Sequence, residues 1–364
     1  MEELISTLRI IRTPFITLKL FWSLIDKHKT ASAVLNYLNN SPDYQYLQIA
    51  SAKAAKLELE TCQKNNITIL AFFSESFPQI LRSYPYCPPV LYCKGNLDLL
   101  KKNLVSIVGS RNCSGNSAKF CYALSSDLSQ NDLVIVSGFA RGIDSAAHLA
   151  ALKNQATIAV FASGLDIIYP KENKDLYNQI IQHGLIISEH PPGTAPRAQY
   201  FPQRNRIIAG LAIIVAIIEA KINSGTMITA KYALEQGKEI FAVPGFPMDP
   251  HYQGNNYLIK NGAQILLSSA DILDYLSLNQ IIDIKPLFSE AQNFSKQIQQ
   301  EASENQLTQA AKEIITLISS TPISLEDLIL LSKYPAEIVS AIIVELELSG
   351  KISRGPGNYF TINL

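Results

Sequence analysis

The chain has 364 residues, of which 47% are hydrophobic and 17% charged, a composition typical of folded proteins and not of disordered chains. Lysine plus arginine balance aspartate plus glutamate at 31 each, which excludes a general positive field, so a nucleic-acid partner would need a local basic patch. The length allows two or three domains and one sizeable core.

The five cysteines include no Cys-x-x-Cys pair, and their odd number argues against a disulfide framework. We therefore expect a reducing, cytoplasmic environment and no zinc site. We expect no signal peptide, because Glu2 and Glu3 open the chain and arginines soon interrupt its apolar residues. The longest apolar run, Ile207–Ile218, has 12 residues, which is too short to span a bilayer.

Residues 1 to about 60 carry apolar side chains at helical spacing, broken at Thr13-Pro14. This pattern predicts a small helical domain over residues 1–65. Two short strands follow, Ile67–Phe72 and Val90–Cys93, joined by a proline-rich connector.

From Leu104 onward, short apolar runs alternate with amphipathic stretches, which predicts a parallel sheet covered by helices on both faces. We assign residues 66–277 to this α/β domain. The expected strands are Leu104–Val108, Leu133–Val136, Thr157–Phe161, Leu185–Ser188, Ile213–Ile218, Glu239–Val243 and Ile265–Leu267. The expected helices lie near residues 115–129, 143–153, 172–182, 204–211 and 226–236, with another from Asp271.

Glycine-bearing turns follow five of the first six of these strands, among them Gly109-Ser110-Arg111 and Ser224-Gly225-Thr226. In open α/β sheets, ligands bind beyond the carboxyl ends of the strands, where small residues and helix N-termini admit anions. Glycine at any one of these turns is explained by tight turn geometry alone. Their number along one edge favours a phosphate-binding rim.

Residues 278–308 are polar and glutamine-rich, which is typical of a linker. Residues 309–364 form a separate small domain in this interpretation. Helical patterns containing Ile314, beginning at Ser324 and running from Pro335 to Ser349 precede two short strands around Gly355-Pro356-Gly357-Asn358. Three helices and a β-hairpin indicate a winged helix.

No common catalytic or nucleotide motif is complete. Gly109 to Gly115 matches neither the dinucleotide fingerprint nor the P-loop, which argues against an ATPase or an NAD enzyme. Asp144 precedes His148 by four residues, but no nucleophile is evident beside them. The simpler interpretation is that Asp144 caps its helix and pairs with His148 structurally. We expect no catalytic residues, no metal site and no cofactor.

With catalysis disfavoured, anion binding is the remaining interpretation. Its strongest signal is the stretch Phe201–Arg206, which lies directly before the longest apolar run. Cationic groups at predicted strand ends, with aromatic residues between them, are how proteins hold single-stranded nucleic acid. The cations are Arg111, Arg197, Arg204, Arg206 and Lys171, and the aromatics are Phe139, Tyr169, Tyr200 and Phe201.

Internal pairing is the competing interpretation for the arginines, because Glu189 and Glu219 lie nearby in the expected fold. We expect at least one of Arg204 and Arg206 to be structural, with Phe201 and the other arginine facing the groove. The sequence does not say which arginine has which role.

Six blocks together resemble the DprA/Smf family of DNA-processing proteins of natural transformation. They are Ile107–Arg111, Ser137–Asp144 with Ala147-His148, Gly164–Asp166 to Tyr169-Pro170, Phe201–Leu211, Glu219-Ala220 to Thr226 with Thr229-Ala230, and Ala242–Gly245. The motifs cover residues 90 to 270, and the flanking domains also fit the family's layout. Each block alone is weak, whereas the set is specific.

The resemblance implies an extended Rossmann-like domain between an N-terminal helical domain of the SAM/HhH-like kind and a C-terminal winged helix. It also implies a homodimer that binds single-stranded DNA and loads the RecA recombinase onto strands displaced from single-strand-binding protein, without catalytic turnover. The candidate DNA-binding residues are Gly109, Ser110, Arg111, Ser137, Gly138, Arg197, Phe201, Arg204, Asn205, Arg206, Ser224, Gly225 and Thr226.

Three departures from the family pattern bear on these roles. Ala198 stands where a basic residue is common, and Arg197 is the nearest substitute. The N-terminal turn Pro14–Thr17 lacks glycine, which argues against phosphate binding there. The third helix of the winged-helix domain bears Glu337, Glu345 and Glu347 but no lysine or arginine, so it would repel DNA and fits a docking or regulatory role.

Two other hypotheses are weaker. A nucleotide-processing enzyme of the LOG, or lysine decarboxylase-like, type would show a Pro-Gly-Gly-x-Gly-Thr-x-x-Glu block. Asn223–Thr226 lacks the first glycine pair of that block, and Thr229 replaces its glutamate. Release of free base from nucleoside monophosphates would identify the enzyme. A regulator of double-stranded DNA is disfavoured by the acidic third helix.

Overall fold

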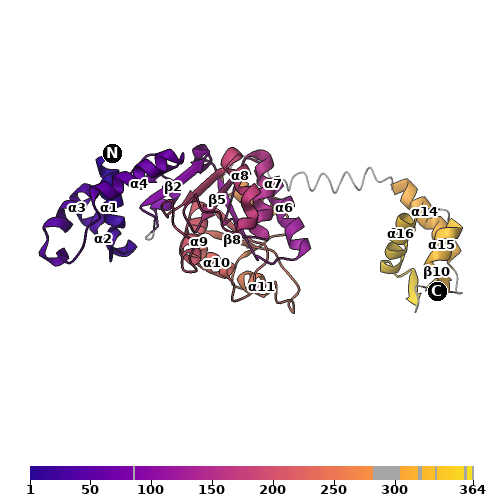
Figure 1. Cartoon of the computed structure of the whole chain (residues 1–364). Helices are drawn as coiled ribbons and strands as arrows, with labels where there is room; N and C mark the ends of the chain where they lie inside the picture. Colours follow the sequence, from indigo (N-terminus) through magenta and orange to yellow (C-terminus); the bar gives the residue numbers. More distant parts are fainter. Residues whose placement is uncertain (85–86, 282–303, 319–321, 333, 356–358, 363–364) are drawn as a thin grey trace. The chain divides into compact units, whose positions relative to one another are not determined.

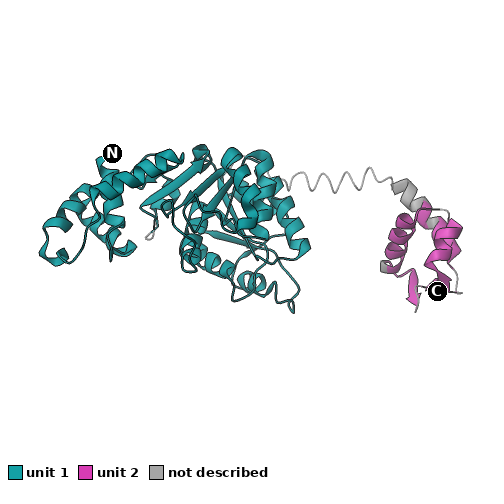
Figure 2. Ribbon diagram, in the orientation of Figure 1, with its two compact units in different colours: residues 1–284 teal, residues 285–364 magenta. Residues whose placement is uncertain are grey.

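The computed structural model describes residues 1–84, 87–281, 304–318, 322–332, 334–355 and 359–362. The chain divides into two compact units, residues 1–284 and 285–364, which are coloured separately in Figure 2. The domain boundaries expected at residues 65, 277 and 308 stay predictions. Most of the expected linker, residues 278–308, lies outside the described residues.

A nine-stranded sheet with the order β1-β2-β6-β5-β4-β3-β7-β8-β9 forms the centre of unit 1 (Figure 1). Strands β3 to β9 pair in parallel, as the sequence predicts, while β1 and β2 extend one edge by antiparallel pairing. The strands are β1 Thr68–Ala71, β2 Val90–Gly95, β3 Leu104–Val108, β4 Val134–Ser137, β5 Thr157–Phe161, β6 Leu185–Ser188, β7 Ile214–Ile217, β8 Glu239–Ala242 and β9 Gln264–Ile265.

Helices cover both faces of this sheet. Successive residues of a strand point to opposite faces, so Ile158 and Val160 pack in one core while Ala159 and Phe161 pack in the other. The helices after β1 are α5 Gln79–Arg82, α6 Gly115–Gln130, α7 Ile143–Ala151, α8 Lys174–His183, α9 Tyr200–Leu211, α10 Gly225–Glu235, α11 Gln253–Lys260 and α12 Ser269–Leu278.

The chain reverses its direction of travel across the sheet at β3. Strands β4, β5 and β6 lie on one side of β3, and β7, β8 and β9 lie on the other. The loops leaving β3 and β7 therefore diverge onto opposite faces and leave a gap beyond their carboxyl ends. Ligands bind at such switch points in open α/β sheets.

Four helices precede the sheet, α1 Glu2–Ile11, α2 Leu18–His28, α3 Ala31–Asn40 and α4 Ala52–Lys64. Phe21, Val34 and Leu38 are buried in a core of their own. A polar cluster joins these helices to the sheet. Arg12 donates to Glu58 at 2.8 and 3.1 Å and to the hydroxyl of Tyr92 at 2.6 Å, and Tyr92 donates to Glu58.

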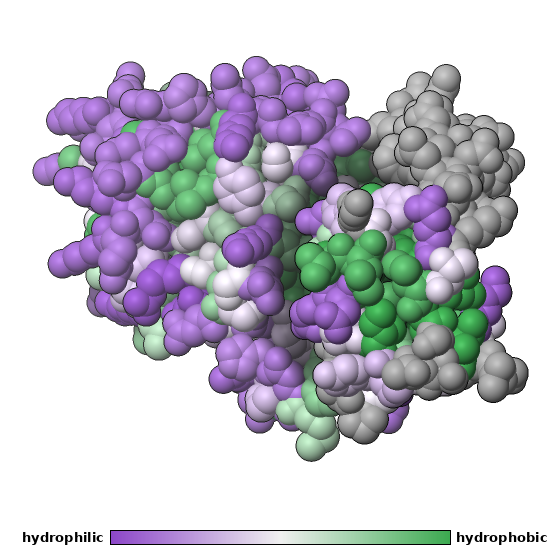
Figure 3. Space-filling model, turned by 90° about the vertical axis from the view of Figure 1, so that its right-hand side faces the viewer, coloured by the Kyte–Doolittle hydropathy of each residue, from purple (hydrophilic) through white to green (hydrophobic). Residues whose placement is uncertain are grey.

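Unit 2 contains the three helices and the hairpin that the sequence predicts. These are α14 Glu304–Leu317, α15 Leu325–Ser332, α16 Ala336–Leu348, β11 Ile352–Gly355 and β12 Tyr359–Ile362. Strand β10, Ile323–Ser324, adds a third strand to the hairpin. Ile314, Leu328 and Phe360 lie in its core, and other apolar side chains gather on its surface (Figure 3).

All five cysteines carry free thiols. Within the described ranges, no helix combines the length and apolar character that crossing a membrane requires. The same residues contain no cluster of three or more potential metal-binding side chains.

The polar cluster at Tyr92 predicts a stability effect. Tyr92→Phe removes the hydroxyl that bridges Arg12 and Glu58, leaving two half-buried charged groups with one partner fewer. We expect the free energy of unfolding to fall by about 1–3 kcal/mol in urea titrations. Tyr46→Phe is the matched control, because Tyr46 is 67% exposed. Equal stability of the wild type and Tyr92→Phe would contradict the role of this cluster.

Candidate nucleic-acid interface

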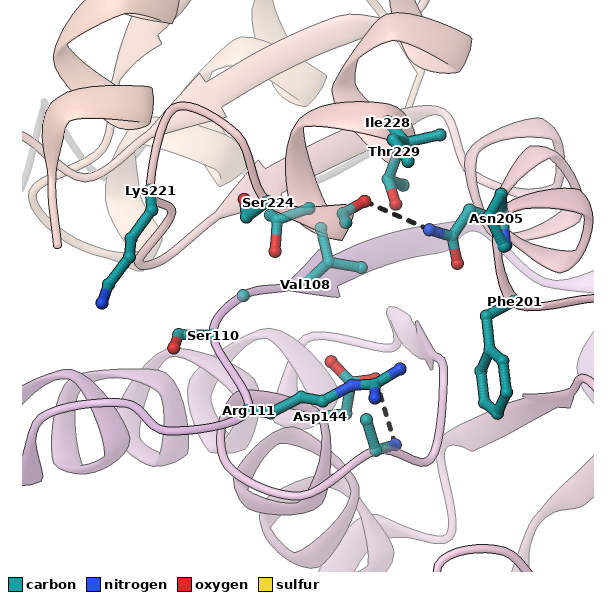
Figure 4. Close-up of a pocket in the computed structure, with 15 residues that line it drawn as sticks. Val108, Ser110, Arg111, Asp144, Phe201, Asn205, Lys221, Ser224, Ile228 and Thr229 are labelled. Atoms are coloured by element: carbon teal, nitrogen blue, oxygen red, sulfur yellow. Dashed lines mark hydrogen bonds between the residues drawn. The ribbon is translucent and has the colours of Figure 1, made fainter. Parts of the chain in front are cut away.

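A cavity of about 300 Å³ opens beyond the carboxyl ends of β3 and β7, at the switch point of the sheet (Figure 4). The loop after β3 forms one wall, the loop after β7 and the start of α10 form another, and α9 closes the third. The lining residues are Val108, Gly109, Ser110, Arg111, Ala140, Asp144, Phe201, Pro202, Asn205, Lys221, Ser224, Gly225, Thr226, Ile228 and Thr229.

Arg111 supplies an exposed cation to this cavity, and its guanidinium carbon lies 5.2 Å from the ring centroid of Phe201. The loop that carries Arg111 packs closely on the turn before α7. At Gly142, whose φ is +74°, a Cβ would lie 2.4 Å from the carbonyl oxygen of Ser110. A glycine is therefore required there for the loop to approach.

The start of α10 is open to an anion. Ser224 is the N-cap of α10, yet its side chain caps no backbone N–H, and its buried Oγ has no hydrogen-bond partner. The first N–H groups of a helix lack intrahelical partners and carry a partial positive charge. Gly225 and Thr226 present these groups to the cavity, with the exposed Lys221 beside them.

Lys221 was missed in the sequence interpretation. The signal that could have found it is its position in the loop between β7 and α10, because β7 pairs with β3 at the switch point.

A smaller recess continues the cavity past Phe201, and the two share Arg111, Ala140 and Phe201. Tyr169 lines this recess, with its ring centroid 5.5 Å from that of Phe201. Arg141 adds a further cation. We refer to the cavity and the recess together as the strand-end groove.

Arg204 lies inside the protein, not in the groove. Its guanidinium donates to the backbone carbonyls of Gly138 and Val160, and the residue is 4% exposed. A Cβ on Gly138 would lie 2.6 Å from Nη1 of Arg204, so the glycine makes room for the guanidinium. Burial lowers the pKa of Arg204 to about 10, while Asp144 opposes the shift, so the group stays charged at neutral pH.

Arg206 is also engaged within the protein. It forms an ion pair with Glu189, and both side chains are largely buried. We expected one of the two arginines to face the groove, but both bond to protein groups. Helix α9 also begins at Tyr200, four residues earlier than the expected start, which places Phe201 and Pro202 in its first turn.

Of the remaining predicted residues, some line the groove and others lie inside the protein or outside the groove. Asn205 lines the cavity and donates to the carbonyl of Gly225 at 3.2 Å, joining α9 to α10. Ser137 is fully buried and donates to the carbonyl of Ile107 at 2.6 Å. Arg197 is exposed but lies outside the groove, with its guanidinium carbon 5.8 Å from the ring centroid of Tyr200.

Two of the four aromatic residues expected in the groove lie elsewhere. Phe139 adopts a φ of +61° and is 1% exposed, with its ring packed 4.7 Å from that of Phe161 in the core. Tyr200 stacks on His190. Tyr169 and Phe201 are the two that reach the groove.

Glu219 holds the loop that follows β3 in place instead of pairing with an arginine. Its carboxylate accepts from the backbone N–H of Ser114 and from His251, both at 2.9 Å. Its carbonyl accepts from the N–H of Ser110 at 2.8 Å. Burial alone would raise the pKa of Glu219, but hydrogen bonds from Ser114, Ser117 and His251 lower it.

The expected Asp144–His148 pair does not form. Asp144 is buried and accepts from the backbone N–H groups of Gly138 and Ala140 at 3.1 and 3.2 Å. Burial raises its pKa, against the influence of Arg204. The ring of His148 bonds instead to the hydroxyl of Thr157 at 2.7 Å. Asp144 thus holds the turn that follows β4, and His148 joins α7 to the first residue of β5.

Comparisons with known proteins cover both units. Residues 68–277 match the family model described as DNA recombination-mediator protein A, and residues 299–358 match the DprA winged helix domain. DNA processing protein DprA of Streptococcus pneumoniae is 43% identical over 230 residues, covering 63% of this chain and 79% of that protein. Protein Smf of Synechocystis sp. is 33% identical over 356 residues, covering 91% of this chain and 86% of that protein.

Two solved structures are also similar. DprA from Streptococcus pneumoniae has a TM-score of 0.62 and 34% identity, covering 74% of this chain and 95% of that chain. DNA processing protein A from Helicobacter pylori, described for its single-stranded DNA binding mode, has a TM-score of 0.53 and 32% identity. That match covers 58% of this chain and 96% of that chain.

Burial of His148 beneath the site predicts a pH effect on stability. Burial, aided by the charge of Arg204, lowers its pKa from 6.5 to about 3. The unfolded chain therefore binds a proton that the folded chain does not, and stability falls as the pH drops below 6.5. The loss from this group is about 2 kcal/mol by pH 5.

Urea unfolding of the wild type and His148→Asn at pH 7 and pH 5 checks this. We expect a smaller acid-induced loss in the variant and a loss equal to that of the wild type in a control, His183→Asn, whose side chain is exposed. An equal loss in all three proteins would contradict the assignment.

Proposed function

Because this chain belongs to the DNA recombination-mediator protein A family, also named DprA or Smf, we propose that it binds single-stranded DNA in the strand-end groove as a recombination mediator. The observation that carries this proposal is the exposed Arg111 over Phe201, next to the uncapped N-terminus of α10. A cation, an aromatic face and a phosphate-binding helix end meet at one switch point.

The groove offers separate places for the two parts of a nucleotide. A backbone phosphate fits the start of α10, where Gly225 and Thr226 present N–H groups and Lys221 adds a charge. Bases stack on Phe201 and Tyr169, with Arg111 between the aromatic faces and the phosphates. Stacking of this kind contributes about 1–3 kcal/mol per base and requires an unpaired base. The arrangement therefore favours single strands over duplex.

Direct contact with DNA is proposed for Gly109, Ser110, Arg111, Phe201, Asn205, Ser224, Gly225 and Thr226, and also for Lys221 and Tyr169. Ser137, Arg204 and Arg206 act by support in this proposal, because their polar groups bond to protein. Gly138 lines the recess, and it also acts by support because the guanidinium of Arg204 fills the space beside its Cα.

Membership of the family supports the wider role. We propose that the chain works as a cytoplasmic homodimer that protects incoming single strands during natural transformation. It loads the RecA recombinase onto strands displaced from single-strand-binding protein, without turnover of its own. A dimer would hold two grooves, and two linked sites bind one strand more tightly than either alone.

Unit 2 has a docking or regulatory role in this proposal. Glu337 and Glu345 are exposed on α16, the helix that would enter a DNA groove in a winged helix. Their charges oppose phosphate. Exposed Leu330 and Leu331 on the preceding helix suit contact with protein.

Arg111→Ala provides the sharpest test of the groove. We expect weaker binding of oligo-dT in fluorescence anisotropy, and a plot of log affinity against log salt whose slope is smaller by about one phosphate contact. Lys231→Ala is the control, because Lys231 pairs with Glu235 on the exposed face of α10. An unchanged salt slope would remove Arg111 from the interface.

The same assay with duplex DNA of equal length tests strand preference. We expect much weaker binding of the duplex, because paired bases cannot stack on Phe201 and α16 repels phosphate. Reversing charge with Glu337→Lys and Glu345→Lys together should raise duplex affinity and leave oligo-dT affinity unchanged. Equal affinity of the wild type for both DNAs would count against the groove.

A further inference from the structure

A second cavity, of about 450 Å³, lies between the N-terminal helices and the α/β region. Ile11, Ile16 and Phe21 line it from α1, α2 and the turn between them, and Glu189, His190 and Tyr200 line it from the other side. The strand-end groove does not include this cavity. The N-terminal wall is mainly apolar but includes Arg12, and the other wall is mainly polar and aromatic.

Two rings of the polar and aromatic wall stack on each other. The rings of His190 and Tyr200 have centroids 4.2 Å apart at an interplanar angle of 36°. The exposed guanidinium of Arg197 lies over the ring of Tyr200. Flat rings with a cation beside them are the components that hold an unpaired base next to its phosphate.

Two polar atoms of this wall lack partners. Nε2 of His190 and Oε1 of Glu189 are buried and form no hydrogen bond in the described part of the chain. Burial lowers the pKa of His190, in opposition to Glu189, so its imidazole is neutral near pH 7. Buried polar atoms without partners are costly, and a small rotation of either side chain toward the cavity would let a ligand with a polar edge relieve that cost. The free carboxylate oxygen accepts only, which suits an imino N–H such as that of thymine or guanine.

The cavity and the groove lie on opposite sides of the start of α9. Phe201 and Pro202 line the groove, whereas Tyr200 and Gln203 line the cavity. A helix with its side chains is about 10–12 Å across, a distance that a short run of nucleotides spans. Arg197, which does not line the groove, lies beside this part of α9, over the ring of Tyr200.

We propose that a single strand bound in the groove continues over the start of α9 and places one unstacked base in this cavity, against Tyr200 and His190. The inference rests on the proposed function and adds a nucleobase site to it. The N-terminal helices then take part in DNA binding by enclosing a base, not by holding phosphate at their turn.

An abasic scan tests this proposal on the full chain. Oligo-dT strands, each with one abasic position moved stepwise, are compared by anisotropy at fixed salt. We expect the wild type to lose affinity at two separated regions of the strand, one for the groove and one for the cavity. Ile16→Trp fills the cavity from the N-terminal side. It should abolish the second loss, weaken binding of intact oligo-dT by about tenfold, and keep the Arg111-dependent salt slope.

Phe15→Ala is the matched control, because Phe15 precedes Ile16 but is 80% exposed and does not line the cavity. Its abasic profile should equal that of the wild type. If circular dichroism shows that Ile16→Trp is unfolded, Tyr200→Leu takes its place, and Tyr200→Phe should retain the second loss.

A single sensitive region in the wild type, or a second loss that persists in Ile16→Trp or Tyr200→Leu, would overturn the proposal. Either outcome leaves the proposed function intact if Arg111→Ala still reduces affinity and salt slope. Absence of any oligo-dT binding would overturn the proposed function together with this inference.

Discussion

The site depends on one buried charge, the guanidinium of Arg204. It reaches from α9 under the strand ends and donates to the carbonyls of Gly138 and Val160, at the ends of β4 and β5. Removing such a group leaves carbonyl oxygens without donors, which costs more than the bonds themselves contribute. Arg204 thereby fixes the orientation of the first turn of α9, so that Phe201 faces Arg111. Glu219 has the corresponding role across the switch point, because it holds Ser110 and Ser114 in place.

The cationic residues near the site therefore divide by solvent exposure. Arg204 and Arg206 are internal and bond to protein, whereas Arg111, Arg141 and Lys221 project beside the groove. A balanced net charge is compatible with nucleic-acid binding in such a molecule, because these three exposed cations lie together at one edge of the sheet. The internal ones give shape to that edge and add little to its attraction for phosphate.

The order of strands and helices was readable from the sequence because buried parallel strands are continuous apolar runs, as at Thr157–Phe161. The loop residues Gly109 to Arg111 and Ser224 to Thr226 were readable because they follow such runs. The direction in which each side chain points was not readable from the sequence. Phe139 looked like a groove residue, but a positive φ turns its ring into the core. The partners of Arg204 are backbone carbonyls, which no residue pattern reveals, and the antiparallel pairing of β2 with β6 joins segments about ninety residues apart.

The position of β3 also has a consequence for folding. It pairs with β4, which follows closely, and with β7, whose residues lie more than a hundred positions later in the chain. Contacts of such high sequence separation form slowly, since a long loop must close first. Both walls of the groove exist only once this closure is complete, so a partly folded chain has no site to offer. A bound strand would select the finished native state and draw the folding equilibrium toward it by mass action.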